Sequence, residues 1–181
     1  MSKTKYKNKL NKLDTVVYVT YTTKYKQIKK ILGKKFLYLN KFIYKKPLKG
    51  GLIITNSRQE NVKGLSQLQK KVFPMLSEEE WFSESHYLKH IETFLEGQFV
   101  ILDGDKVIGM STTMRSHLVL ESHTFLEISG NNYLTTHDPE GEWLYGLDVG
   151  VDHDYRGIGL GREIYRARQE LVKHLGLKGQ I

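Results

Sequence analysis

The chain of 181 residues contains no cysteine. This absence excludes disulfides, thiolate metal sites and a cysteine nucleophile, and it is compatible with a reducing cytosol. Long apolar runs are missing too, so we expect no contact with a membrane. We also expect the protein to be cytoplasmic. The first apolar stretch, TVVYVTYTT, is short, rich in hydroxyl groups and preceded by lysines, which does not fit a signal peptide.

Acidic residues are almost absent from the first 50 positions, which hold fifteen lysines, no arginine and one acid, Asp14. Residues 51–181 carry 13 basic and 19 acidic residues, so the net charge of +8 arises from the basic leader. This asymmetry predicts a lysine-rich extension over residues 1–50 and a separate domain over residues 51–181. Because arginine and any nucleic-acid motif are absent from the leader, a solvated extension is favoured over an arm that binds nucleic acid.

Within the leader, residues 1–13 are typical of a disordered arm. Residues 15–22 and 36–44 are rich in Val, Tyr, Phe and Thr and favour strands, with a short helix between them that Gly33 ends. The segment KKPLKGG at residues 45–51 combines a proline with a Gly-Gly pair, and it is predicted to be a linker.

From residue 52 the apolar pattern becomes regular. LIIT predicts a short buried strand, and a helix that Pro74 closes has helically spaced apolar positions at Val62, Leu65, Leu68 and Val72. Ser77 and Glu80 then form a capping box that predicts the start of a second helix. Its expected apolar stripe contains Trp81, Leu88, Ile91 and Leu95, and Gly97 is its expected stop.

The remaining pattern completes a mixed α/β domain. QFVILDGDKVIGMSTTMR predicts two strands around a turn at residues 103–105, and TFLEIS, inside a long polar stretch, is expected to add a strand. EWLYGLDVGV is expected to be one strand with Leu147, Val149 and Val151 on one face. The last helix has a stripe of Leu160, Ile164, Ala167, Leu171 and Leu175, with an Arg166–Glu170 pair on its polar face. The order β-α-α-β-β-insert-β-α is typical of a mixed, α+β-like fold.

The stretch YRGIGLG lies between the last strand and the last helix. A dinucleotide fingerprint fails, because its third glycine would fall on Arg162, and the Lys-Ser/Thr of a nucleotide P-loop is absent. A glycine-rich loop that opens a helix suits an anion, because unpaired amides and the helix dipole point toward it. Arg156 and Arg162 add formal positive charge at the two ends of the loop.

The segment LDVGVDHDYRGIGLGREIY resembles the acetyl-CoA-binding motif of the GNAT N-acetyltransferase superfamily, with Arg156, Gly159 and Gly161 at the signature positions. The resemblance covers residues 52–181. Within the superfamily, THDPEGEWLYGLDVGV, YRGIGLGREIYRARQEL and GQFVILDGDKVIGMSTTMR are similar to the GNAT domain fused ahead of a carbon–nitrogen hydrolase domain.

The resemblance implies an acyl-CoA N-acyltransferase fold, with acetyl-CoA as co-substrate and a small-molecule or peptide amine as acceptor. The pyrophosphate of coenzyme A would lie beside Arg156, on the amides of Gly157, Ile158, Gly159, Leu160, Gly161 and Arg162. The pantetheine arm would pair with the backbone of Val149, Gly150 and Val151. An amide near Val149 would stabilise the oxyanion that forms when the amine attacks.

The general base is less sharply indicated. Asp148 is the candidate catalytic residue, although it is expected to face away from Leu147 and Val149 and could equally be a solvated or hydrogen-bonded carboxylate. Glu127, Glu142 and a chain of waters are the alternatives. The family continues with a strand, a helix and a closing β pair, whereas this chain stops at LKGQI, so its C-terminal part is expected to be missing and no tyrosine can be assigned as the acid. His153 stands where the family often has proline.

Metal binding is not expected. His86 and His90 have the i,i+4 spacing of a zinc pair, but Tyr87 replaces the required glutamate and no third ligand is evident. Two alternatives to an active acetyltransferase stay open. One is a non-catalytic CoA-binding or interaction domain, completed by a partner or by a homo-oligomer. The other is a fragment of a bifunctional acetyltransferase and carbon–nitrogen hydrolase.

Overall fold

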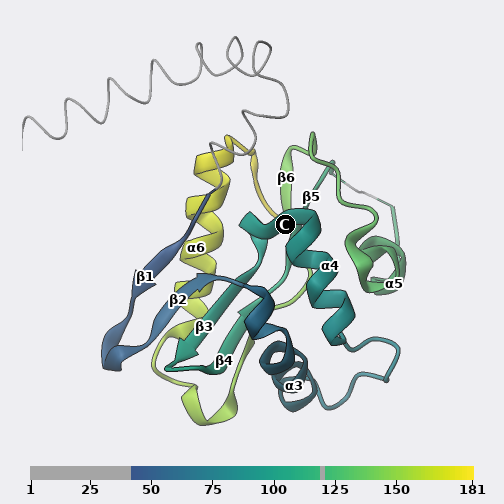
Figure 1. Ribbon diagram of the computed structural model, residues 1–181. Helices are drawn as coiled ribbons and strands as arrows, with labels where there is room; N and C mark the ends of the chain where they lie inside the picture. Colours follow the sequence, from purple (N-terminus) through teal and green to yellow (C-terminus); the bar gives the residue numbers. More distant parts are fainter. Residues whose placement is uncertain (1–41, 119–120) are drawn as a thin grey trace, which may run out of the picture. The chain divides into compact units, whose positions relative to one another are not determined.

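A five-stranded antiparallel sheet forms the centre of the computed structural model, which describes residues 42–118 and 121–181 (Figure 1). The strand order is β1-β2-β3-β4-β7. The bounds are β1 Lys45–Pro47, β2 Ile53–Asn56, β3 Phe99–Asp103, β4 Lys106–Ser111 and β7 Gly150–Val151. The expectations for residues 1–41, including the strand at 15–22, lie outside the described residues.

A smaller, three-stranded sheet is formed by chain segments that adjoin strands of the first sheet. It is ordered β5-β6-β8, with β6 antiparallel to β5 and parallel to β8. Its strands are β5 Thr113–Ser116, β6 Trp143–Gly146 and β8 Gly179–Gln180. Only Thr112 separates β4 from β5, and residues 147–149 separate β6 from β7, so the same two stretches of chain contribute to both sheets.

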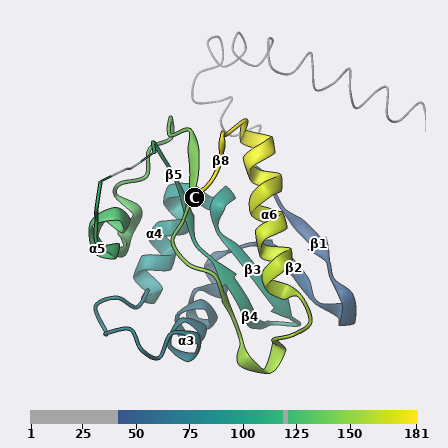
Figure 2. The ribbon, with the colours of Figure 1, turned by 180° about the vertical axis from the view of Figure 1, so that it is seen from behind.

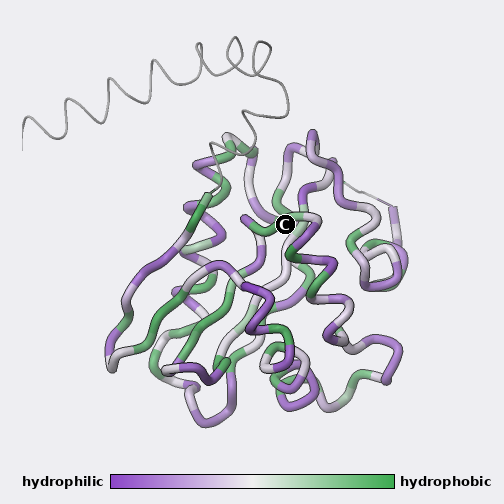
Figure 3. Tube along the Cα trace, in the orientation of Figure 1, coloured by the Kyte–Doolittle hydropathy of each residue, from purple (hydrophilic) through white to green (hydrophobic). Residues whose placement is uncertain are grey.

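Helices cover both faces of the central sheet. Helices α3, Val62–Val72, and α4, Glu84–Phe94, lie on one face, and α6, Leu160–Leu175, lies on the other, as Figures 1 and 2 show. Two buried clusters correspond to these faces. The α6 side includes Ile54, Phe99, Ile108, Leu144 and Ile164, and the α3/α4 side includes Leu65, Phe82, Tyr87, Val100 and Met110. Figure 3 shows the apolar residues gathered on the central strands and polar residues on the turns around them.

The remaining elements are short. They are α5 Phe125–Ser129 and the single turns η1 Lys49–Gly51, η2 Gln59–Asn61, η3 Leu95–Gly97, η4 Gly130–Leu134 and η5 His153–Tyr155. Within the part of the chain that the structure describes, no helix is long and apolar enough to cross a membrane.

Several sequence predictions are confirmed. The strand at LIIT is β2, and the first helix is α3. The hairpin β3–β4 turns at Gly104, whose φ of +56° lies in the left-handed region that favours glycine. The α6 stripe is buried at Leu160, Ile164, Ala167 and Leu171, and Leu175 packs against it. These segments have strong local periodicity or a strong turn signal, which is why the sequence alone locates them.

The linker predicted at residues 45–51 is wrong. Lys45 pairs with Thr55 and Pro47 pairs with Ile53, so the segment is the edge strand β1 followed by a tight turn. Proline is tolerated there because an edge strand does not need every amide for a ladder. The compact unit that contains this sheet begins at Phe42.

The second helix begins later than the capping box at Ser77 predicts. Ser77 N–H does donate to Glu80 at 2.9 Å, but this closes only a turn. Helix α4 begins after Ser83, whose N–H donates to His86 Nδ1 at 3.1 Å. Just before that cap, Phe82 is 0% exposed and its ring lies 5.7 Å from that of Tyr87, which is a hydrophobic staple.

The buried face of α4 therefore differs from the one that the sequence predicts. Tyr87, His90 and Phe94 are buried, whereas Leu88, expected on the apolar stripe, is exposed. TFLEIS is also not a strand but the helix α5, because Thr124 and Glu127 cap each other's backbone amides at 2.7 and 3.2 Å.

EWLYGLDVGV is two strands rather than one. The amides of Leu147 and Asp148 both donate to the Thr112 carbonyl, at 3.0 and 3.4 Å, which is a β-bulge. As a result Leu147 packs on the α3/α4 side while Val149 packs on the α6 side, so the predicted single face does not exist. The Arg166–Glu170 pair is also not formed, because Arg166 pairs with Glu163.

Candidate functional site

The glycine-rich loop joins β7 to α6. After η5, Gly157 and Gly159 have φ of +81° and +89°, the left-handed region that residues with a Cβ rarely adopt. These two glycines turn the chain from the strand into the helix. Sequence spacing alone indicated a tight approach here, and the dihedral angles give its cause.

The N-terminus of α6 has no side-chain cap. Gly159 is its N-cap residue, and the first backbone bond of the helix runs from Glu163 N–H to Gly159 O at 3.2 Å. The amides before Glu163 therefore face the loop without an intrahelical partner, and the helix dipole adds partial positive charge. This is the local chemistry of an anion site.

Gly161 gives an independent indication of what the loop accommodates. Its φ is not in the left-handed region, and a Cβ built there would meet nothing within 4 Å. The fold therefore does not require glycine at this position, and a glycine in a helix is less favourable than alanine by about 1 kcal/mol. The missing side chain leaves open space directly above the free amides, as a bound phosphate group would need.

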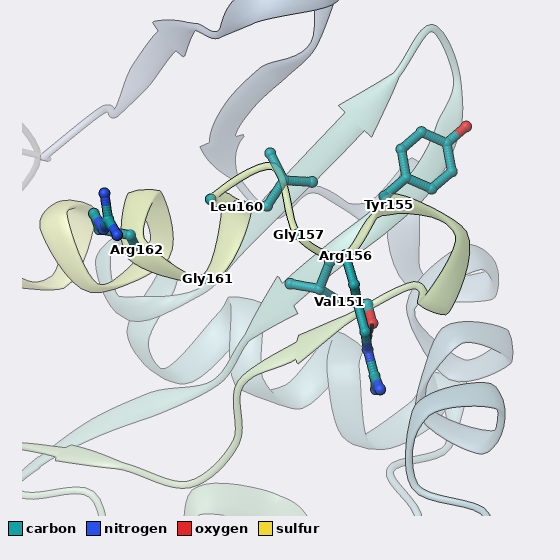
Figure 4. Close-up of a pocket in the computed structure, with 8 residues that line it drawn as sticks. Val151, Tyr155, Arg156, Gly157, Leu160, Gly161 and Arg162 are labelled. Atoms are coloured by element: carbon teal, nitrogen blue, oxygen red, sulfur yellow. Dashed lines mark hydrogen bonds between the residues drawn. The ribbon is translucent and has the colours of Figure 1, made fainter.

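A cavity of about 410 Å³ lies over these amides (Figure 4). Seven predicted cofactor residues line it, and Tyr155, which the sequence did not single out, lines it as well. The lining residues are Val151, Tyr155, Arg156, Gly157, Gly159, Leu160, Gly161 and Arg162. In Figure 4 the side chains of Arg156 and Arg162 extend in different directions from the two ends of the loop. Of the other predicted residues, Ile158 is 66% exposed, and Val149 and Gly150 lie farther along the chain toward β6.

The outer edge of β7 continues this site. Among the described residues β7 is the last strand of its sheet. Asp152 N–H donates to Ile108 O at 2.8 Å, so the alternation of an antiparallel ladder turns the amides of Val149 and Val151 away from β4. On that edge the Val151 carbonyl accepts a 3.4 Å bond from Arg156 Nε. An extended ligand can therefore pair with this edge as an added strand would.

Asp148, the predicted catalytic residue, lies in the bulge. Its Oδ1 accepts the Thr112 N–H at 2.5 Å, and its Oδ2 is buried without a hydrogen-bond partner among the described residues. Burial raises the pKa of Asp148, while the Thr112 amide and the charge of Arg168 act in the opposite direction. What the structure shows is the hydrogen-bonded carboxylate that the sequence left as the alternative.

Arg168 lies beside the candidate site, and the sequence alone did not indicate it. It is 5% exposed, and its guanidinium donates to Ser111 Oγ at 2.8 Å, to Thr112 O at 3.4 Å and to Asp148 O. One signal was available, because Arg168 directly follows Ala167 on the apolar stripe of α6, where a charge needs a buried partner.

Asp152 anchors the start of the loop. Its carboxylate is 3% exposed and accepts from Lys71 of α3 at 2.5 Å, with Lys106 of β4 3.4 Å away. Burial by itself raises the pKa of Asp152. The hydrogen bonds from Lys71 and from the Asp154 amide outweigh this effect, so the pKa is lowered to about 2. The loop is thereby fixed to both α3 and the hairpin β3–β4.

The remaining candidates have structural roles. Glu127 caps α5, Glu142 pairs with Lys178 at 2.8 Å, and His90 Nε2 lies 2.6 Å from the Asn132 carbonyl. His86 serves in the cap of α4, so the two histidines do not face a common site. Within residues 42–118 and 121–181, no three His, Cys, Asp or Glu side chains are grouped so that they could hold a metal ion.

Residues 62–181 match the model of the Acetyltransferase (GNAT) family. The chain belongs to this family. Probable hydrolase YhcX of Bacillus subtilis (strain 168) is 33% identical over 132 residues, which are 72% of this chain and 25% of that protein. Uncharacterized N-acetyltransferase YkwB of the same organism is 31% identical over 124 residues, 67% of this chain and 55% of that protein. The chain thus spans about a quarter and about half of these relatives.

Solved structures share the fold. The loading GNATL domain of CurA from Lyngbya majuscula has a TM-score of 0.55 at 20% identity, over 66% of this chain and 57% of that chain. GphF, a GNAT-like decarboxylase in complex with isobutyryl-CoA, has a TM-score of 0.52 at 20% identity, over 65% and 57%. The predicted GNAT fold is confirmed. The predicted likeness to hydrolase-fused GNAT domains has only loose support, in the name of YhcX.

Proposed function

We propose that this GNAT domain is an acetyl-CoA-dependent N-acyltransferase that transfers an acetyl group to a primary amine on a small molecule or a peptide. One observation carries the proposal: the uncapped N-terminus of α6 stands behind Gly157, Gly159 and Gly161 at the open edge of β7. Membership of the GNAT acetyltransferase family supports acyl transfer to an amine in general.

The positive charge and the free amides around the cavity support coenzyme A as the ligand. The pyrophosphate would lie on the amides from Gly157 to Arg162, with Arg156 nearby, and the pantetheine arm would follow the outer edge of Val149, Gly150 and Val151. The Val149 amide, which points away from β4, would then donate to the oxygen of the thioester carbonyl as charge develops there. The remaining work of the protein is to orient an amine and to move one proton.

Asp148 stays a proposed catalytic residue. Its hydrogen bond to the Thr112 amide favours a positioning role. In this role the carboxylate stabilises the bulge and thereby sets the direction of the Val149 amide. Substitution by asparagine separates the two roles, because the amide keeps the acceptor oxygen and loses the basic one.

Calorimetry and thermal unfolding with acetyl-CoA test the cofactor assignment. A ligand at 100 times its Kd stabilises the folded chain by about 2.7 kcal/mol. Gly161→Leu places a side chain in the open space above the free amides and is expected to abolish binding without lowering the Tm, because the helix prefers leucine to glycine. Gln169→Leu, on the exposed side of the same helix, is the matched control and is expected to bind as the wild type does.

Two results would contradict the proposal. Absence of both heat and thermal shift at about 1 mM acetyl-CoA would remove the cofactor assignment, since it corresponds to binding no tighter than the millimolar range. If the chain binds acetyl-CoA but releases no CoA thiol with any primary amine, the remaining function is that of a non-catalytic CoA-binding domain.

A further inference from the structure

A tyrosine and a histidine to which the proposed function gives no role meet on the smaller sheet. Tyr145 lies in β6, and its hydroxyl is 2.9 Å from Nε2 of His123, just before α5. The two rings are 6.0 Å apart and tilted by 59°. Tyr145 is half-buried and His123 is exposed, so the pair connects the sheet to solvent.

The hydrogen bonds of His123 define which member of this pair donates the hydrogen and which accepts it. Nδ1 of His123 is 2.9 Å from the main-chain carbonyl of Glu121. A carbonyl can only accept, so in the neutral imidazole Nδ1 carries the hydrogen and Nε2 has the free lone pair. Tyr145 therefore donates its hydroxyl hydrogen to Nε2, and His123 is set to receive that proton.

Tyr145 faces away from α6. Its neighbour Leu144 is 0% exposed in the core beneath α6, and a Cβ at Gly146 would come within 2.6 Å of Arg168 Nη1. Successive side chains of a strand point to opposite faces, so Tyr145 projects from the face that α6 does not cover. This is also the face to which the contact with His123 holds it.

The α6 side of the bulge is closed. Arg168 fills it with bonds to Ser111, Thr112 and the main chain of Asp148. An acyl group held at Val149 would therefore be reached by an amine from the other face. Tyr145 is the hydroxyl that β6 presents on that face, two residues before the bulge begins.

We propose that Tyr145 and His123 form the proton relay of the transfer reaction. Tyr145 accepts a proton from the acceptor nitrogen while it passes its own hydrogen to Nε2 of His123, so the phenol stays neutral. A C–N bond forms, the C–S bond breaks, and the leaving thiolate takes a proton from solvent. The imidazolium returns its proton to solvent, because His123 is exposed. Tyr145 would touch the reacting atoms, whereas His123 acts through it.

Glu127 of α5 interacts electrostatically with the imidazole of His123, and Glu121 supplies the carbonyl on its other side. Glu127 is also fixed in the cap of α5 by Thr124 at 2.7 Å.

The relay rests on the proposed function, and its test is thiol release from acetyl-CoA with a panel of primary amines from about pH 6 to 9, because a general base shows itself in the pH profile. Tyr145→Phe is expected to lower kcat by about 10²-fold, the lower end of what acid–base catalysis contributes, with the Kd for acetyl-CoA unchanged. His123→Asn is expected to lower kcat and to remove the acidic limb of the profile. Tyr165→Phe on α6 and His117→Asn are the matched controls, both exposed and both expected to match the wild type.

The outcomes separate the relay from the function on which it depends. If the wild type turns over and Tyr145→Phe and His123→Asn keep its kcat and pH profile, the relay is overturned and the acetyltransferase stands. If the wild type binds acetyl-CoA but releases no thiol with any amine, transfer and relay both fall. Nitrogen-15 NMR of His123 in the wild type gives a second readout, which does not depend on whether the variants fold. A wild-type imidazole protonated on Nε2 in its neutral form would contradict the relay.

Discussion

Arg168 reaches from α6 to the main-chain carbonyl of Asp148, and the same guanidinium bonds Ser111 Oγ at 2.8 Å. A buried cation thereby holds the place where the two sheets separate. The arrangement gives a polar interior to the region behind Val149 without opening it to solvent. A salt bridge to the Asp148 carboxylate is not needed for this, because the contact runs through the carbonyl.

Replacing Arg168 by methionine is expected to destabilise the chain by about 1–3 kcal/mol, the usual penalty for buried acceptors left unpaired. The bulge should also loosen, so the affinity for acetyl-CoA falls. Urea unfolding and calorimetry measure the two effects. Arg166→Met is the control, because Arg166 is exposed and its ion pair among the described residues, with Glu163, lies at the surface. Equal unfolding midpoints for the two variants would show that the buried bonds contribute nothing.

Asp148→Asn is expected to leave stability at pH 7 unchanged or raised. Burial raises the folded-state pKa of Asp148 above the ordinary value of 3.8. An acid with a raised pKa stabilises the fold below its unfolded pKa and loses that contribution as the pH rises, so at pH 7 the charge is a net liability. Asparagine can still accept the Thr112 amide. Urea unfolding at pH 7, with Asp105→Asn in the hairpin turn as control, measures the sign.

The rate of Asp148→Asn distinguishes its two roles. If Asp148 positions the bulge, kcat should fall less than about tenfold, whereas loss of a general base removes about 10²–10⁴-fold. A fall in that larger range would make Asp148 the base and contradict the relay through Tyr145.

Two histidines, the buried His90 and the half-buried His137, make the fold sensitive to acid. Burial lowers the pKa of His90 and of His137 from the ordinary 6.5 to about 4. The unfolded chain therefore binds more protons between these values, and stability is lost as the pH falls from about 6.5 to about 4. For His90, a shift of this size corresponds to on the order of 3 kcal/mol.

The variant His90→Gln isolates this contribution. Glutamine can still donate to the Asn132 carbonyl but does not titrate in this range. Unfolding free energies measured at pH 7 and at pH 5 should differ less in the variant than in the wild type. A pH dependence identical to that of the wild type would remove His90 as the cause.

The sequence located the parts of the fold that depend on local information. The apolar repeat of α6 and the turn at Gly104 act within a few residues, and both are where they were expected. The start of α4 was misplaced because Ser83 and Ser77 are equally good caps locally. Burial of Phe82 between elements that are distant in the chain decides between them.

The site was predictable to a similar extent. The loop from Arg156 to Arg162 is contiguous, so its glycine spacing could be read directly, and most of it lines one cavity. The split between β6 and β7 depends on the Thr112 carbonyl of another strand, which no window of sequence contains. The contact between His123 and Tyr145 is also a product of tertiary structure, because a helix and a turn intervene.

Asp152 has a consequence for the way in which the loop meets a ligand. Its carboxylate, held by Lys71 and near Lys106, fixes α3, β4 and the first residue of the loop at one point. The proposed anion-binding loop is therefore ordered before anything binds, and little chain entropy remains to be lost on association. Affinity at this loop should accordingly be set by how well a ligand matches a rigid template, and association should proceed without a preceding rearrangement of the loop.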